Sequence, residues 1–86
     1  MQTPADLLKQ WLTNEEISQQ ELGDRINVSR FTISQLVNGH RNVTAEMAVR
    51  LEEQTGILAH TWMRHQAEMD IELARKNLRK GSRLKK

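Results

Sequence analysis

The sequence contains no cysteine and no tyrosine, one proline, one phenylalanine and two tryptophans. Without cysteine, neither a disulfide framework nor a thiolate metal site can form. No apolar run approaches the roughly 20 residues of a membrane span, and the N-terminus lacks a signal-peptide pattern. We therefore expect a cytoplasmic protein that binds no membrane. A chain of 86 residues forms one small domain that buries only roughly 60–65% of its unfolded surface, which leaves no room for a deep catalytic cleft.

Acidic residues are missing from two segments. Residues 75–86 hold seven basic residues and no acid, so residues 1–74 carry six basic and eleven acidic groups, a net charge of −5 within a chain of +2. The high isoelectric point therefore belongs to the tail and does not by itself indicate a nucleic-acid-binding domain. The second segment, Arg25 to Ala45, holds three arginines, a histidine and no carboxylate. In an otherwise acidic body, we expect this segment to face an anion.

Helix start and stop signals recur at short intervals, and β-branched alternation is scarce, so the sequence predicts an all-α fold of five helices. Four helices are expected to begin after the hydroxyl residues Thr3, Ser18, Ser29 and Thr44. The first should end near Thr13 or Asn14, and Ser18 with Glu21 should form a capping box on the second. The third and fourth helices are expected to end at the glycines Gly39 and Gly56.

A long fifth helix is predicted from about Leu58 to Leu78. It carries two apolar stripes, more than one small core needs, which indicates a partner surface. The stripes are Trp62, Gln66, Met69 and Leu73, and Met63, Ala67, Ile71, Ala74 and Leu78. We therefore expect one folded domain of residues 1–78 with a surface for self-association, followed by a disordered basic tail of residues 79–86. The tail is either solvated or contacts a nucleic-acid backbone.

The second and third helices, joined by Asn27-Val28, fit a helix-turn-helix. Inward apolar positions fall at Leu22, Ile26, Val28, Ile33 and Leu36. Gly23 costs about 0.5–1 kcal/mol relative to alanine inside a helix, so we expect it where the two helices cross closely. Asn27 occupies a turn position that often needs positive φ, which asparagine tolerates. The alternative is an ordinary helical hairpin, but the agreement of glycine, turn and apolar positions favours the helix-turn-helix.

The third helix carries a polar face without acids, turned away from its apolar residues. In a helix-turn-helix, the second helix enters the major groove of DNA with its N-terminal residues against the bases. Gln35 matches adenine, Arg30 matches guanine or phosphate, and Phe31 matches a thymine methyl unless it covers the second helix instead. Helix starts and the residues after the third helix should contact phosphates. The predicted DNA-binding set is Gln19, Gln20, Ser29, Arg30, Phe31, Thr32, Ser34, Gln35, Asn38, Arg41 and Asn42.

Two segments together resemble the HigA-type antitoxins, helix-turn-helix proteins of the Xre superfamily with a lambda-repressor-like fold. The first runs from I-S-Q-Q-E-L-G-D-R-I to A-V-R-L, residues 17–51. The second, Trp62-Met63-x-His65-Gln66-x-x-Met69-Asp70-Ile71, is similar to W-L-x-L-Q-x-x-Y-D-L in that family. The resemblance covers about residues 5 to 74.

The resemblance implies a two-gene toxin–antitoxin module. The protein would be a homodimer that binds a palindromic operator in double-stranded DNA, represses its own operon and neutralises a RelE/HigB-like mRNA endonuclease. A dimer or partner interface is expected at Trp62, Gln66, Met69, Asp70, Ile71 and Leu73. The alternative for Trp62, Gln66 and Asp70 is that they organise packing.

No catalytic constellation is visible, and we expect no enzyme, cofactor or metal site. His60 and His65 lie five residues apart and do not share a helical face, while His65 and Glu68 lack a third ligand. Two other binding roles stay open: a stand-alone or phage-type repressor without a toxin, and an interaction protein that has lost DNA binding. The segment from Trp62 to Ile71 favours the antitoxin over the first. The acid-free face argues against the second.

Overall fold

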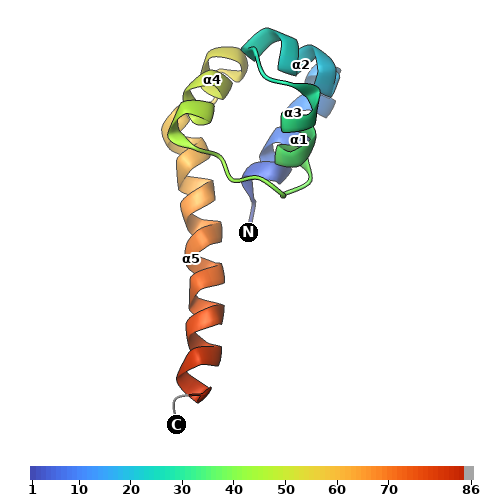
Figure 1. Cartoon of the computed structure of the whole chain (residues 1–86). Coiled ribbons are helices and arrows are strands. Elements are labelled where there is room, and N and C mark those ends of the chain that lie inside the picture. The colour runs from blue at the N-terminus through green and yellow to red at the C-terminus, as the bar shows by residue number, and fades with distance from the viewer. Residues whose placement is uncertain (85–86) are drawn as a thin grey trace.

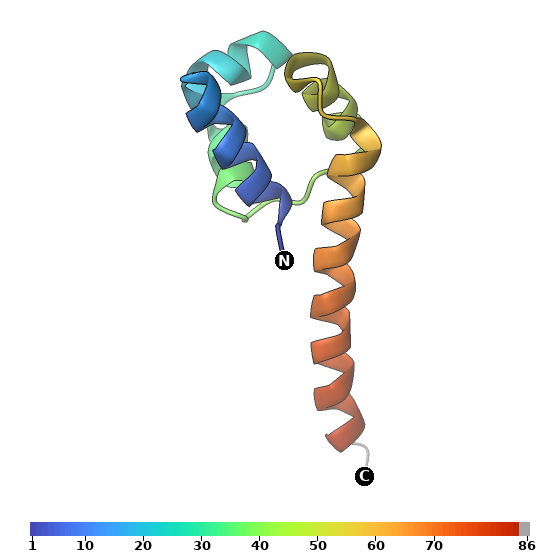
Figure 2. The same ribbon diagram turned by 180° about the vertical axis from the view of Figure 1, so that it is seen from behind.

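The computed structural model describes residues 1–84 and contains five helices in that range: α1 (Pro4–Glu15), α2 (Gln19–Ile26), α3 (Arg30–Val37), α4 (Ala45–Thr55) and α5 (Ala59–Leu84). No strand occurs among these residues, so the predicted all-α fold is confirmed. Helices α1 to α4 form a small body, and α5 runs away from it as a single long rod (Figure 1). The reverse view shows the same projection (Figure 2).

Each of the first four helices begins where the sequence predicts. The hydroxyl side chains accept a hydrogen bond from the backbone N–H three residues further on, in the pairs Thr3–Asp6, Ser18–Glu21, Ser29–Thr32 and Thr44–Met47. The reciprocal bond of a capping box forms in α1, from Thr3 N–H to Asp6. In α2 the Glu21 carboxylate instead pairs with Arg25 at 2.6 Å, so the predicted capping box is formed on one side only.

The core draws side chains from all five helices. It consists of Leu8, Leu12, Leu22, Ile26, Ile33, Leu36, Val37, Val43, Ala48, Leu51 and Trp62. Trp62 is fully buried and is the largest of these side chains. Because Trp62 lies in the first turns of α5, this end of the long helix is held in the body by apolar packing.

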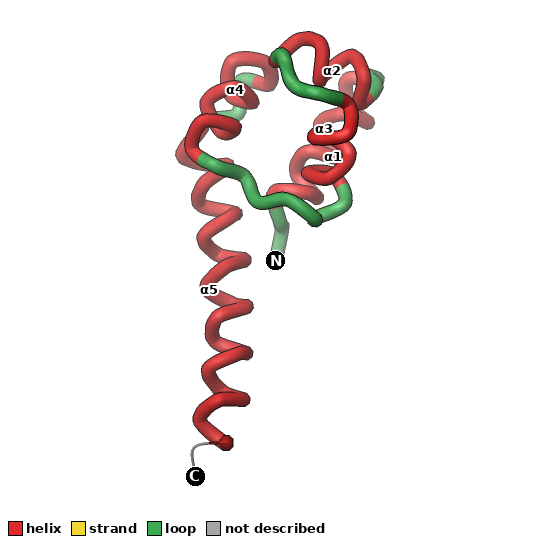
Figure 3. The backbone as a smooth tube through the Cα atoms, in the orientation of Figure 1, coloured by secondary structure: helices red, strands yellow, loops and turns green. Residues whose placement is uncertain are grey.

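Two hydrogen bonds between distant segments hold the start of α5 in the body. Glu52 of α4 accepts from the backbone N–H of Ala59 at 2.6 Å, so a side chain from another helix caps α5. The loop of residues 38–44 crosses from α3 to α4 beside α5 (Figure 3), and Val43 N–H donates to Gln66 Oε1 at 2.8 Å. Gln66 also donates to Asp70 at 2.9 Å.

These contacts correct part of the predicted partner interface. Trp62 is 0% exposed and Gln66 is 4% exposed, so both belong to the core of the protomer and offer no surface to a second protein. Further along α5 the apolar side chains lie in solvent: Ile71 is 50% exposed and Leu73 is 58% exposed. A partner can therefore contact this part of the two stripes, but not Trp62 or Gln66.

The fifth helix is longer than the sequence predicts. It continues to Leu84 instead of ending near Leu78, and Gly81 lies within it. Glycine weakens a helix by about 1 kcal/mol but removes no backbone hydrogen bond, so it does not force an end as proline does. Residues 79–84 of the expected tail are therefore helical in this structure, and residues 85 and 86 lie outside the described residues.

Candidate nucleic-acid interface

Gly23 lies where α2 and α3 cross. A Cβ atom added to Gly23 would meet the backbone oxygen of Val28 at 2.7 Å and a side-chain carbon of Ile33 at 3.5 Å. A backbone oxygen cannot rotate away as a flexible side chain can, so any other residue here would push the two helices apart. The predicted close approach at Gly23 is confirmed, and it fixes how α3 sits on α2.

The turn between these helices is held from both sides. Asn27 adopts φ 60° and ψ 47°, the left-handed conformation that the sequence predicts, and Val28 N–H donates to Gly23 oxygen at 2.9 Å. From α4, Arg50 donates to the carbonyl of Ile26 at 2.8 Å. A cation at the C-terminus of a helix is stabilised by the helix dipole. The α2–α3 unit is thus anchored to the body at its turn.

Helix α3 separates an apolar and a polar face. Ile33, Leu36 and Val37 are no more than 6% exposed, whereas Phe31 is 66% exposed. The outward position predicted for Phe31 is confirmed, and the alternative, in which it covers α2, is wrong. An exposed phenylalanine on an otherwise polar helix face offers apolar contact to whatever that face binds.

Several polar side chains on this surface are paired with one another. Ser29 Oγ accepts from Thr32 N–H and lies 3.0 Å from Thr32 Oγ1. Asn38 donates to Ser34 at 3.3 Å. Gln35 Oε1 accepts two hydrogen bonds from Arg41. The other predicted contact residues of this region, Arg30 and Asn42, are exposed.

Carboxylates that border the acid-free segment are paired with neighbours. Glu21 pairs with Arg25 at 2.6 Å, and Glu46 pairs with Arg50 at 3.0 Å. Asp24 accepts from Gln20 at 3.0 Å. Surface ion pairs add little stability, but Arg25 and Arg50 offset the negative charges of Glu21 and Glu46 beside the face of α3. Gln20 is exposed, as predicted, although its amide is engaged by Asp24.

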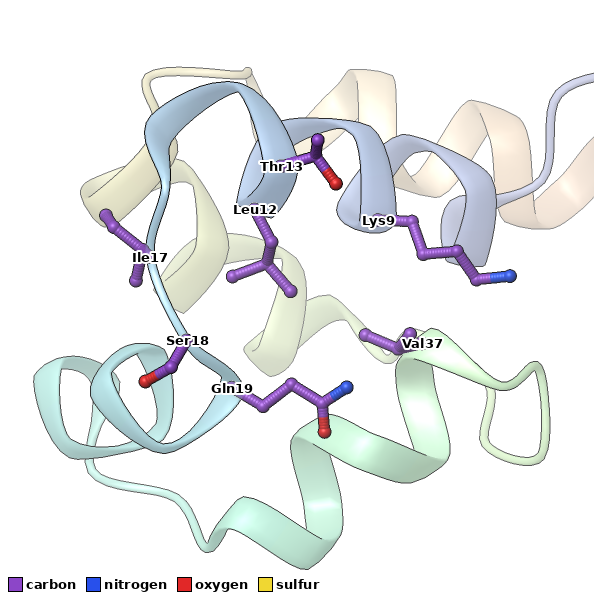
Figure 4. A pocket seen from close by; sticks show the side chains of 7 residues that line it. All are labelled: Lys9, Leu12, Thr13, Ile17, Ser18, Gln19 and Val37. Atoms are coloured by element: carbon purple, nitrogen blue, oxygen red, sulfur yellow. The ribbon is translucent and has the colours of Figure 1, made fainter.

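An open hollow lies between α1 and α3 at the start of α2, and one residue that lines it, Lys9, is absent from the predicted DNA-binding set. Gln19 and Lys9 both line it, with the Gln19 side chain lying between the helices (Figure 4). Lys9 is exposed and belongs to α1. Its charge lies outside the acid-free segment in sequence, so only the packing of α1 against α3 reveals that it borders the same surface.

Among residues 1–84, a metal site would require clustered ligands, and a helical membrane span would require a long apolar helix. Nowhere in that range do three histidine or acidic side chains gather in a way that could hold a metal ion. None of the described helices is both long and apolar enough to cross a membrane.

Residues 8–62, from α1 to the first turns of α5, match the model of a helix-turn-helix family, HTH_3. The chain belongs to this helix-turn-helix family. The matched segment contains the complete α2–α3 unit with Gly23 and Asn27, so the motif predicted from the sequence is confirmed. The family is of the Xre type, and the predicted antitoxin-like fold is also confirmed by similar solved structures.

A relative and two solved structures show how far the likeness of this helix-turn-helix protein extends. The Escherichia coli protein YbaQ, described as an uncharacterized HTH-type transcriptional regulator, is 33% identical over 78 residues, covering 90% of this chain and 69% of YbaQ. The Pseudomonas aeruginosa antitoxin HigA, solved with the higBA promoter, has a TM-score of 0.87 at 28% identity, covering 93% of this chain and 88% of HigA. An addiction module antidote protein of the HigA family from Coxiella burnetii has a TM-score of 0.82 at 25% identity, with coverage of 93% and 88%.

Proposed function

We propose that this protein binds a palindromic operator in double-stranded DNA through α3 and represses transcription. The observation that carries this proposal is the acid-free outer face of α3. The close crossing of α2 and α3 at Gly23 holds this face in one orientation. An α-helix fits the major groove, where the base edges are accessible. The similarity to HigA, which was solved with its promoter, supports the same role.

In this proposal, the position of each residue decides whether it contacts the bases or the phosphates of the DNA. The first turns of α3, with Arg30, Phe31 and Ser34, face the bases, as N-terminal residues of a recognition helix do. Phosphates are contacted by the N-terminal N–H groups of α2 and α3 and by exposed side chains that border them, including Lys9 and Asn42. Each cation that neutralises a phosphate adds about 0.9 to the slope of log affinity against log salt.

A homodimer supplies the two recognition helices that a palindrome needs. The exposed part of α5 has apolar residues at coiled-coil spacing, Ile71, Ala74 and Leu78. Its charges divide along the helix: residues 68–72 carry three acids, and residues 75–80 carry four bases and no acid. An antiparallel pair of α5 helices sets opposite charges against each other, whereas a parallel pair sets like charges together.

The antiparallel arrangement also gives a suitable distance. If two α5 helices cross at Ala74, each Trp62 lies 12 residues from the crossing. At about 1.5 Å per residue, the two bodies are then about 36 Å apart along the helix axis. Half-sites one turn apart on DNA are separated by about 34–36 Å. Pairing through α5 therefore supports a dimer that spans one turn of DNA.

The dimer also acts as an antitoxin in this proposal, binding and neutralising a RelE/HigB-like mRNA endonuclease. The support is the likeness to HigA and to the HigA-family antidote protein. A repressor without a toxin is the second candidate, and the likeness to YbaQ, which is described only as a transcriptional regulator, favours it. Co-expression with the adjacent gene separates the two. Growth rescue with co-purification supports the antitoxin, and the absence of both leaves the repressor.

Gel shifts with the DNA upstream of the gene test the DNA-binding role. Wild-type protein is expected to retard this DNA more strongly than an unrelated duplex, with affinity that falls steeply with salt. Gln35→Ala on the outer face of α3 should lose this preference, whereas Gln10→Ala on the exposed side of α1 should not. Binding by Gln35→Ala that equals the wild type and does not respond to salt would refute the assigned face.

A further inference from the structure

Gln35 and Arg41 are hydrogen-bonded to each other on the outer surface of α3. Gln35 is half-buried near the end of α3, and Arg41 is exposed in the loop that follows. Arg41 donates to Oε1 of Gln35 from Nε at 3.0 Å and from a terminal guanidinium nitrogen at 2.6 Å. A guanidinium group has donors and no acceptor, so the amide of Gln35 must turn its oxygen toward Arg41. The chemistry of the partner thus decides the orientation of this amide.

The hydrogen bonds between Gln35 and Arg41 leave only hydrogen-bond donors of these two side chains facing outward from α3. An amide oxygen can accept two hydrogen bonds, and Oε1 of Gln35 already accepts two from Arg41. The free side of Gln35 is then its NH2 group, which only donates. The remaining N–H groups of Arg41 are donors as well. Together the two side chains present hydrogen-bond donors to a ligand and no acceptor.

Adenine and guanine present different hydrogen-bonding groups in the major groove to a surface that only donates. A free glutamine matches adenine because it donates to the N7 atom and accepts from the amino group. Guanine presents two acceptors, N7 and O6, in the major groove. While Arg41 holds its oxygen, Gln35 has nothing to accept the adenine amino group, but it can donate to guanine.

We infer that the Gln35–Arg41 pair recognises guanine, with Arg41 as the residue that changes the preference of Gln35 from adenine to guanine. This inference rests on the proposed binding of DNA through α3. It replaces the adenine contact that the sequence alone suggests for Gln35, and it gives Arg41 a role beyond holding a phosphate. If Arg41 contacted only a phosphate, replacing it would weaken binding to all DNA sequences equally and would leave the base preference unchanged.

Selection of bound duplexes from a library with a randomised centre tests the inference. Gln35→Ala identifies the base pair concerned, because preference is lost at that position alone. There the wild type is expected to favour guanine over adenine by about fivefold or more, the lower range for one bidentate contact. Arg41→Ala should favour adenine at the same position and keep the rest of the motif. Arg41→Lys should behave likewise, since it retains the charge but not the planar fork of donors.

The outcomes separate the inference from the proposed function. The inference is overturned if the wild type prefers adenine at that position, or if both Arg41 variants keep guanine and bind all sequences more weakly. It also fails if Gln35→Ala changes the preference at no position. In each of these cases, a sequence motif enriched by the wild-type protein would still support the proposed DNA binding. A wild-type selection that enriches no motif refutes the proposed function and the inference together.

Discussion

The buried glutamine of α5 offers a sharp test of how this protein is held together. Gln66 is 4% exposed, and its Oε1 accepts from the backbone N–H of Val43 at 2.8 Å. Gln66→Met keeps an unbranched side chain of similar size but removes the acceptor, which leaves that N–H group buried without a partner. Such a group costs about 1–3 kcal/mol. In a domain of this size we therefore expect the melting temperature to fall by roughly 4–8 °C per kcal/mol.

Urea denaturation at several protein concentrations is the appropriate assay. Because the lost bond lies within one protomer, the decrease in the free energy of unfolding should be the same at every concentration. Gln10→Met, on the exposed side of α1, is the matched control and should change stability by less than about 0.5 kcal/mol. A Gln66→Met protein with unchanged unfolding but weakened self-association would refute this reasoning and return Gln66 to the partner interface.

Three further predictions follow from single contacts. Gly23→Ala should destabilise by about 1–3 kcal/mol and weaken DNA binding, because its Cβ would lie 2.7 Å from the Val28 oxygen; an increase in stability on thermal melting, as helix propensity alone predicts, would contradict the crossing. Glu52→Ala removes the acceptor for Ala59 N–H and should cost about 0.5–2 kcal/mol in chemical denaturation, while the neighbouring exposed Glu53→Ala should cost almost nothing. Phe31→Ala should leave stability unchanged and weaken binding most on operators with thymine opposite it; equal losses on all duplexes in a gel-shift series would exclude the methyl contact.

The helix-turn-helix could be predicted because its determinants are local. Ser18 and Ser29 bond to backbone groups three residues away, and Asn27 sits within a turn of a few residues. Gly23 was conspicuous because glycine is unfavourable inside a helix, and its neighbour across the crossing, Val28, is only five residues further along the chain. Interactions over so short a separation leave a pattern in the sequence.

The sequence predicted less well where α5 ends and which residues of its apolar stripes are buried in the protomer. The stripe that begins at Trp62 and Gln66 has the spacing of any amphipathic helix, and this spacing is the same for a face that packs inward and one that binds a partner. Which residues are buried depends on where α5 leaves the body. In this structure that point lies between Gln66, which is 4% exposed, and Ile71, which is 50% exposed.

The sequence by itself determined the presence of five helices, the first turns of α1 to α4, the sharp turn between α2 and α3, and the outward direction of Phe31. Each follows from the backbone geometry of a few adjacent residues. Tertiary structure alone decided that Gln66 serves Val43, 23 residues away, that Glu52 caps α5, that Lys9 borders the surface of α3, and that Arg41 occupies the oxygen of Gln35. These contacts join segments whose separation depends on packing and loop path. No spacing rule along the chain contains that information.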